Sequence, residues 1–173
     1  DATTLDYTEE TAALPVFPSL TVADPDSANL SGAVIRITGN YNADGSLDTL
    51  SFTNTAQITG TFEIATGTLT LTGTATVADY EAALQSVGFR NQFDGATAAN
   101  RTVSLYVIDD SNLSSNTVTR TVAITTVNNP PMLAALESTA ASYKYNDPFS
   151  PRPQITAALS IYDSDSPTMS RAI

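Results

Sequence analysis

A short acidic motif that occurs twice constrains this chain more than any other feature. Residues 20–27 read Leu-Thr-Val-Ala-Asp-Pro-Asp-Ser, and residues 159–166 read Leu-Ser-Ile-Tyr-Asp-Ser-Asp-Ser. In both places an alternating apolar stretch runs into Asp-x-Asp-Ser, and Asp24 and Asp163 stand 139 positions apart. Self-similarity of this kind is typical of tandem repeats. The sequence therefore predicts one complete repeat followed by the opening of a second.

The stretch between the two copies predicts where the repeats join. Tyr7-Thr8-Glu9 matches Tyr145-Asn146-Asp147 at a spacing of 138, so a single insertion separates the two segments. The second copy follows Asn128-Asn129-Pro130-Pro131, and a double proline cannot continue a strand ladder and stiffens a connection. We therefore expect a complete domain over residues 1–131 and the N-terminal part of a second over 132–173. The second part is either cut from a longer array or completed by a neighbouring subunit, because unpaired strand edges recruit other chains.

The charge balance narrows the possible partners. With 18 acidic against 7 basic residues the formal charge is -11, whereas nucleic acids and anionic membranes are recognised by clustered Lys and Arg. No apolar run is long enough to cross a bilayer. Cysteine and histidine are absent, which removes disulfides, thiolate sites, His-ligated zinc and Ser-His or Cys-His nucleophiles. We expect no nucleic-acid partner, no membrane insertion and no enzymatic activity, and the acidity favours cation binding.

Apolar alternation with period two predicts that the first domain is built of short strands. The clearest example is Ala33, Ile35 and Ile37, which alternate with polar positions. Strands are expected around residues 2–8, 20–22, 33–41, 50–52, 58–64, 69–71, 103–107 and 118–124. Turn or loop residues are expected at 42–45, 65–67 and 94–100, and two prolines at 14–18 indicate a connector there. The middle of the domain is thus predicted to be an antiparallel meander.

One segment departs from this rhythm. Val77, Tyr80 and Leu84 fall at helical spacing, and Thr76 stands three residues before Asp79 as a capping pair. We expect a short helix over residues 77–86 that ends before a glycine. Many short strands with turn signals and one short helix predict an all-β fold, a Greek-key β-sandwich.

Acidic or amide residues are expected to gather at the ends of these strands. The clusters are Glu9 and Glu10, Asp24 and Asp26, Asp109 and Asp110, and Asn128 and Asn129, with Asp163 and Asp165 in the second copy. Calcium takes six to eight oxygen ligands, so several clusters must converge to form a site. We expect the first domain's strand ends and the linker to share one pole, facing the second copy's motif. The alternative is turn chemistry, since Asp, Asn and Ser are ordinary residues of tight turns.

These motifs resemble cadherin-type repeats, in particular the cadherin-like repeats of very large bacterial surface proteins. The resemblance implies an Ig-like Greek-key sandwich and calcium ions at the junctions between successive domains. Asp24 and Asp26 would then serve the preceding junction. The ligands it implies at the junction within this chain are Glu9, Glu10, Asp109, Asp110, Asn128, Asn129, Asp163 and Asp165. Cadherins usually carry Asp where this chain has Asn129, which implies fewer or weaker ions.

The function that the sequence predicts is a calcium-stiffened spacer in an extracellular adhesin or surface filament, active in cell adhesion. Its partners would be neighbouring repeats of the same polypeptide or neighbouring subunits, and glycans are possible. One alternative is a carbohydrate- or protein-binding β-sandwich module. Another is a filament subunit assembled by strand complementation.

Overall fold

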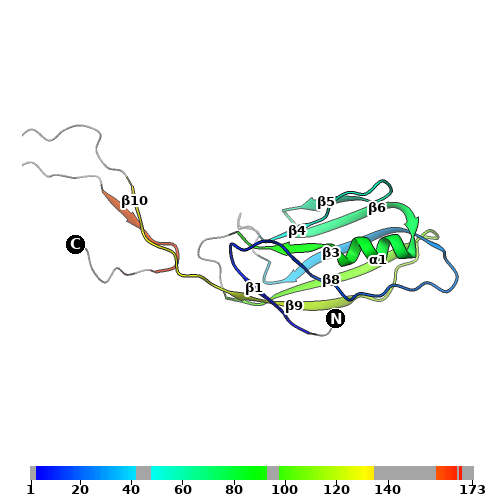
Figure 1. Ribbon diagram of the computed structural model, residues 1–173, viewed down its shortest axis with the longest axis horizontal. Helices are drawn as coiled ribbons and strands as arrows, with labels where there is room; N and C mark the ends of the chain where they lie inside the picture. Colours follow the sequence, from blue (N-terminus) through cyan, green and yellow to red (C-terminus); the bar gives the residue numbers. More distant parts are fainter. Residues whose placement is uncertain (1–2, 42–47, 93–97, 135–158, 167, 169–173) are drawn as a thin grey trace, which may run out of the picture. The chain divides into compact units, whose positions relative to one another are not determined.

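The computed structural model describes residues 3–41, 48–92, 98–134, 159–166 and 168. The chain divides into two compact units, Asp1–Val127 and Asn128–Ile173, and each is described by itself. The elements of the first unit are β1 (Leu5–Thr8), β2 (Leu14–Pro15), β3 (Asn29–Gly39), β4 (Thr49–Ser51), β5 (Thr59–Glu63), β6 (Thr68–Thr76), α1 (Val77–Gln85), β7 (Gly88–Arg90), β8 (Arg101–Asp109) and β9 (Val118–Thr125). Their arrangement is drawn in Figure 1.

The larger sheet of the first unit has the order β1-β9-β8-β3-β6-β5. Strand β3 lies at its centre and pairs antiparallel with β6 on one side and β8 on the other. Buried and exposed side chains alternate along β3: Ala33, Ile35 and Ile37 are buried, whereas Arg36 and Thr38 are exposed. One face of β3 therefore packs against the core. The two outermost pairings differ, since β1 runs parallel to β9 and β5 forms an antiparallel hairpin with β6.

The smaller sheet has the order β2-β7-β4 and corrects two expectations. The predicted meander is wrong, because β4 leaves β3 and joins this second sheet instead. The predicted connector at 14–18 contains β2, in which Leu14 pairs with Phe89 and Pro15 with Gly88. A proline is tolerated there because β2 is an edge strand. The strand predicted at residues 20–22 does not form.

Helix α1 connects the larger sheet to the smaller one and confirms the predicted helix. Thr76 Oγ1 accepts a hydrogen bond from the Asp79 N–H at 3.1 Å, which caps the first turn. Tyr80, Ala83 and Leu84 form its buried face. The Tyr80 hydroxyl donates to the Gly73 carbonyl at 2.6 Å, so the helix is also fixed to the strand that precedes it.

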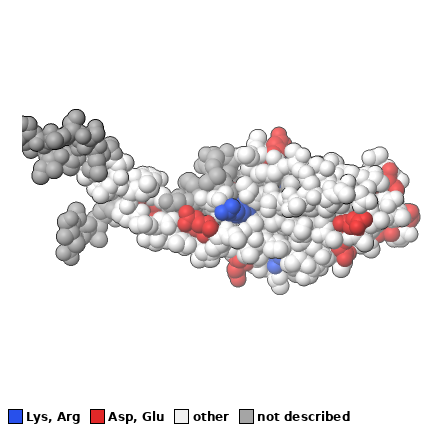
Figure 2. Space-filling view, turned by 45° about the horizontal axis from the view of Figure 1, so that its top comes forward, with Lys and Arg blue, Asp and Glu red and all other residues white. Residues whose placement is uncertain are grey.

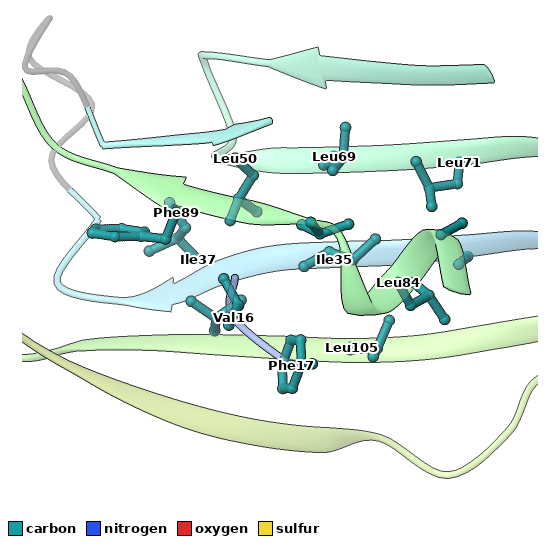
Figure 3. Packing of buried hydrophobic residues seen from close by; sticks show 14 of the residues in the cluster. Val16, Phe17, Ile35, Ile37, Leu50, Leu69, Leu71, Leu84, Phe89 and Leu105 are labelled. Carbon is teal, nitrogen blue, oxygen red and sulfur yellow. The ribbon is translucent and has the colours of Figure 1, made fainter. Parts of the chain in front are cut away.

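The core lies between the two sheets and beneath the helix. Figure 3 shows Ile35 and Leu105 of the larger sheet, Phe89 of the smaller sheet and Leu84 of the helix converging on it. Each of these side chains is at most 2% exposed. At roughly 25 cal/mol per Å² of apolar surface removed from water, burial of this kind is the main source of stability. A β-sandwich-like fold with one short helix, as predicted, is confirmed.

The second unit is described only in part. Strands β10 (Met132–Ala134) and β11 (Ser160–Tyr162) pair antiparallel, with Leu133 opposite Ile161. The predicted turn at 42–45, most of the loop at 94–100 and the match at 145–147 lie outside the described residues. Among the helices of the described residues, none is long and apolar enough to cross a membrane.

Candidate functional site

The first acidic turn, residues 24–27, precedes strand β3. Asp24 Oδ1 accepts hydrogen bonds from the backbone N–H of Asp26 at 3.2 Å and of Ser27 at 3.0 Å. An aspartate that binds amides two and three positions ahead closes a tight turn with its own side chain. One oxygen of Asp24 therefore serves the backbone, which is the role that turn chemistry predicts.

The two carboxylates of the first acidic turn have pKa values shifted in opposite directions. The Ser27 N–H, followed by the hydrogen bond with Asp26, lowers the pKa of Asp24. The hydrogen bond with Asp24, followed by its negative charge, raises the pKa of Asp26, and the charge of Asp109 adds to this. The two carboxylates thus influence each other's pKa, because like charges disfavour full ionisation of a close pair.

Asp109 and Asp110 lie at the same end of the first unit as this turn. Asp109 pairs with Leu30 at the start of β3, and its Oδ1 accepts the N–H of Ser111 and Leu113, both at 2.8 Å. Asp110 Oδ1 accepts the Ser27 hydroxyl at 3.2 Å. The structure therefore joins the Asp109 loop to the first acidic turn. Figure 2 shows several acidic side chains at one end of this domain and few basic ones on the face drawn.

Glu9 and Glu10 lie at the opposite end of the domain. The Glu9 N–H donates to the Thr125 carbonyl at 3.1 Å, and Glu9 Oε1 accepts the Val127 N–H at 2.7 Å. This side chain is 1% exposed. Glu10 has a positive φ of 63° and donates its N–H to the Asn91 carbonyl at 2.9 Å. The Glu9 bonds hold the end of β1 against the end of β9, and the Glu10 bond attaches it to the residue after β7.

The expectation that Asp109 and Asp110 share a pole with Glu9 and the linker is wrong. Strands β8 and β9 are antiparallel, with Leu105 opposite Val118, so the end of β8 lies beyond the start of β9. The nine residues of β8 separate the two ends by about 26 Å, at roughly 3.3 Å per residue. The linear order of the clusters does not reveal this, because strand direction alternates along the chain.

The second acidic turn, residues 163–166, repeats the hydrogen bonds of the first. Asp163 Oδ1 accepts the N–H of Asp165 at 3.2 Å and of Ser166 at 2.8 Å. Here the linker also takes part, because Asn129 donates its N–H to Asp165 Oδ2 at 2.6 Å. The Ser166 hydroxyl donates to Asn128 Oδ1 at 3.4 Å. The structure thus brings four of the predicted site residues together within the second unit.

The hydrogen bond from Asn129 changes the electrostatics of this turn. It is the largest cause that lowers the pKa of Asp165, followed by a hydrogen bond with Asp163. The other carboxylate oxygen, Asp165 Oδ1, is buried and has no hydrogen-bond partner within the described part of the chain. A buried carboxylate oxygen without a partner is costly, and a cation would satisfy it.

Metal-binding geometry is limited among the described residues. No group of three or more acidic side chains in that part of the chain is placed to hold a metal ion. Calcium also takes amide, carbonyl and water oxygens, and the oxygens of Asn128 and Asp165 belong to this chemistry. The second acidic turn therefore supplies oxygen atoms of the kind that calcium binds, and calcium ligation there stays a prediction.

Two polar arrangements escaped sequence reasoning because their members are far apart in the chain. Glu81 Oε2 accepts the Val22 N–H at 2.8 Å, which attaches α1 to the segment before the first acidic turn. Arg101 Nε and Asp48 Oδ2 form a buried ion pair at 2.7 Å, and Asn91 Nδ2 donates to Asp48 Oδ1 at the same distance. The one signal is that Arg101 stands in the same alternation as the buried apolar residues Val103 and Leu105.

Comparisons with known proteins find one distant similarity. The chain is 35% identical over 99 residues to halomucin of Haloquadratum walsbyi. The match covers 54% of this chain but 1% of halomucin, so the chain spans about one hundredth of that protein's length. No protein-family model and no solved structure matches the chain. The resemblance to cadherin-like repeats therefore stays a prediction.

Proposed function

We propose that this chain is a structural repeat of a long extracellular protein, with calcium stiffening the joints between successive β-sandwich units. The observation that carries the proposal is the Asp-x-Asp-Ser turn, which occurs twice with the same two backbone hydrogen bonds. In its second copy the linker residue Asn129 is bound to Asp165. The same turn forms twice, and its second copy binds the linker. We therefore assign it to the junction between successive units.

The similarity to halomucin supports the extracellular part of the proposal. Halomucin is a mucin by name, and the matched stretch is a small part of a very long polypeptide. The formal charge of -11 suits a long chain that must stay soluble, because net charge far from zero opposes association. A role in cell adhesion follows from the predicted surface location and is part of the proposal.

Calcium is the cation that we propose for the joints. Asp163, Asp165, Asn128 and Asn129 form the better candidate site, since Asp165 Oδ1 is buried without a partner in the described part of the chain. Asp24, Asp26, Asp109 and Asp110 lie at one end of the first unit, but no three described carboxylates are grouped to hold a metal ion, so calcium ligation there stays a prediction. When bound, calcium would neutralise these carboxylates and join oxygen ligands from different segments. Calcium ligation by Glu9 and Glu10 stays a prediction.

Thermal unfolding with and without calcium tests this proposal. We expect a higher Tm in saturating calcium than in EGTA at constant ionic strength, because a ligand that binds only the folded chain stabilises it, by about 2.7 kcal/mol at 100 times its Kd. Small-angle X-ray scattering should show a longer particle. Asp165→Asn should weaken the response, whereas Asp6→Asn removes an exposed carboxylate from β1 and should leave it unchanged.

Two results would count against the proposal separately. If chelation changes neither the melting curve nor the scattering profile, calcium has no structural role here. If the polypeptide from which this chain comes contains no further copies of the unit, the repeat itself is the wrong interpretation. Magnesium at the same concentration serves as the control for simple charge screening.

A further inference from the structure

The segments that precede the two acidic turns differ in one respect. In the second unit, β11 pairs antiparallel with β10, so that Met132 lies opposite Tyr162 and Ala134 opposite Ser160. The constant spacing between the copies makes residues 21–23 the counterpart of β11. Residues 21–23 form no strand, although their sequence alternates in the same way. Among the described residues, no strand pairs with residues 21–23.

The backbone of this segment is held on one side only. The Val22 N–H donates to Glu81 Oε2, and Gln85 Nε2 donates to the Leu20 carbonyl, both at 2.8 Å. Within the described residues the backbone groups of Thr21 and Ala23 have no hydrogen-bond partner. In extended chain the N–H groups of successive residues point to opposite sides. Those of Thr21 and Ala23 are therefore directed away from the helix that holds Val22.

A groove lies along the same segment. One part, of about 110 Å³, is lined by residues 20–23 together with Leu105, Val107 and Val118. The adjoining part, of about 280 Å³, extends past Asp24 to Leu113. Its walls mix aliphatic side chains with polar ones such as Ser115 and Asn116, and it ends beside the first acidic turn. It therefore offers both apolar surface and hydrogen-bonding groups to a short strand.

We propose that residues 21–26 are a docking edge for residues 128–134 of a second copy of this chain. The register follows from the second unit, with Met132 opposite Ala23, Leu133 opposite Val22 and Ala134 opposite Thr21. Docking replaces the pairing of β10 with β11, and the Asn129 N–H, which binds Asp165 in its own unit, binds Asp26 of the other copy instead. Strand addition to an open edge gains main-chain hydrogen bonds and specific side-chain pockets.

The properties of both surfaces favour this occupant. Met132 and Leu133 are 65% and 62% exposed in their own unit, so docking in the groove buries apolar surface that the second unit leaves in water. Asp26 is exposed whereas Asp165 is partly buried, as expected if Asp26 lacks the segment that covers its counterpart. The inference rests on the proposed succession of repeats but needs no calcium.

Cysteine cross-linking tests the docking edge and its register. The chain has no cysteine, so Ala23→Cys and Met132→Cys each create a single thiol. The two variants of the full chain, one of them isotopically labelled, are mixed in EGTA under mild oxidation, and mass spectrometry quantifies the heterodimer. Cβ atoms of directly opposite residues lie about 4.5–5.5 Å apart, close enough for a disulfide after a small shift.

We expect the pair Ala23→Cys and Met132→Cys to give about ten times more heterodimer than Ile64→Cys and Met132→Cys, a factor that corresponds to about 1.4 kcal/mol. Ile64 is 64% exposed and lies in the β5–β6 hairpin, outside the groove. Ala23→Cys with Ala134→Cys should give less, because the register is two residues off. An unlabelled peptide of residues 126–136 should reduce the yield by competition.

Second-site variants separate docking from random collision. Asp26→Asn in the Ala23→Cys chain should lower the yield, because a charged acceptor for Asn129 is lost. Asp165→Asn in the Met132→Cys chain should raise it, because the segment is less firmly held in its own unit. Circular dichroism checks that each variant is folded. Equal yields for all pairs would overturn the docking edge, and would leave calcium binding at the joints to be judged by the melting experiment.

Discussion

The two Asp-x-Asp-Ser turns have the same internal hydrogen bonds but different surroundings. The first acidic turn stands on a domain with a packed core, and its Ser27 hydroxyl binds Asp110. The second belongs to a unit in which the side chain of Ile161 is 50% exposed. Because the turn forms in both settings, its four residues are sufficient to specify it. The rest of the chain determines which further residues each turn binds.

The difference is clearest at the second aspartate of each turn. The pKa of Asp26 is raised by its hydrogen bond with Asp24 and by the charge of Asp24. The pKa of Asp165 is lowered, chiefly by the N–H of Asn129. The pKa of the second aspartate is therefore shifted in opposite directions in the two turns, since a donor stabilises the charged carboxylate. Four substitutions test this comparison.

Arg101→Ala should have the largest effect and should separate the two turns. It leaves Asp48 buried without its ion-pair partner, and removing one member of a buried pair costs about 3–5 kcal/mol. For a domain of this size we expect the Tm of the first unit to fall by about 10–20 °C. Amide exchange measured by NMR should accelerate at Ser27 and stay unchanged at Ser166.

Arg36→Ala provides the matched control for this substitution. Arg36 is exposed on β3, and its Nε donates to the Thr66 carbonyl at 3.3 Å. Loss of an exposed arginine should move the Tm little. If both variants unfold at the same temperature, the buried pair does not support the domain that carries the first acidic turn. If Ser166 exchanges faster in Arg101→Ala, the second turn is not independent of that domain.

Asp24→Ala and Asp163→Ala should each have a smaller effect than Arg101→Ala. Each should affect only the unit that contains its own turn. Each removes the acceptor of two backbone N–H groups and opens its turn. Asp24→Ala should lower the Tm of the first unit by a few degrees, because only a surface turn is lost. Asp163→Ala should leave that Tm unchanged but remove the amide protection of β10 and β11.

Asp6→Ala is the control for these two variants, since it removes an exposed carboxylate from β1 without opening a turn. Its Tm and its amide exchange should match those of the wild-type chain. Loss of β10 protection in Asp24→Ala would show that the two turns are coupled after all.

Local patterns predicted the pieces of this fold better than their arrangement. The alternation of Ile35 and Ile37 identified β3, and Thr76 with Asp79 identified the start of α1. The partners of β3 could not be predicted in this way, because sheet order depends on side-chain packing between distant segments. The absence of a strand at residues 20–22 has the same origin: no described segment pairs with them, and Val22 instead binds Glu81, 59 positions away.

In the candidate site, too, the local motifs were predicted better than their arrangement in space. The repeat identified both acidic turns and the linker asparagines, which the second unit brings together. Sequence reasoning misplaced Asp109, because two neighbouring strands in the chain run in opposite directions and their loops lie at opposite ends. A period of two identifies which face a residue occupies, whereas strand direction requires knowledge of the pairing.

The smallest expected effect is a change in the pKa of Asp165. It tests whether the N–H of Asn129 causes the difference between the two turns. In the wild-type chain, carboxyl ¹³C shifts should place Asp26 above and Asp165 below the ordinary value of 3.8. A lowered folded pKa gives stability that is present above 3.8 and is lost as the pH falls through the folded pKa, so the Asn129 contact should open in acid. For Asp26 the sign is reversed: its charge weakens the first turn as the pH rises through the raised pKa. Asn129→Pro removes the N–H donor and should bring the pKa of Asp165 back up, without moving that of Asp26. An unchanged Asp165 titration in that variant would mean that the turn itself, and not the linker, sets the difference between the two copies.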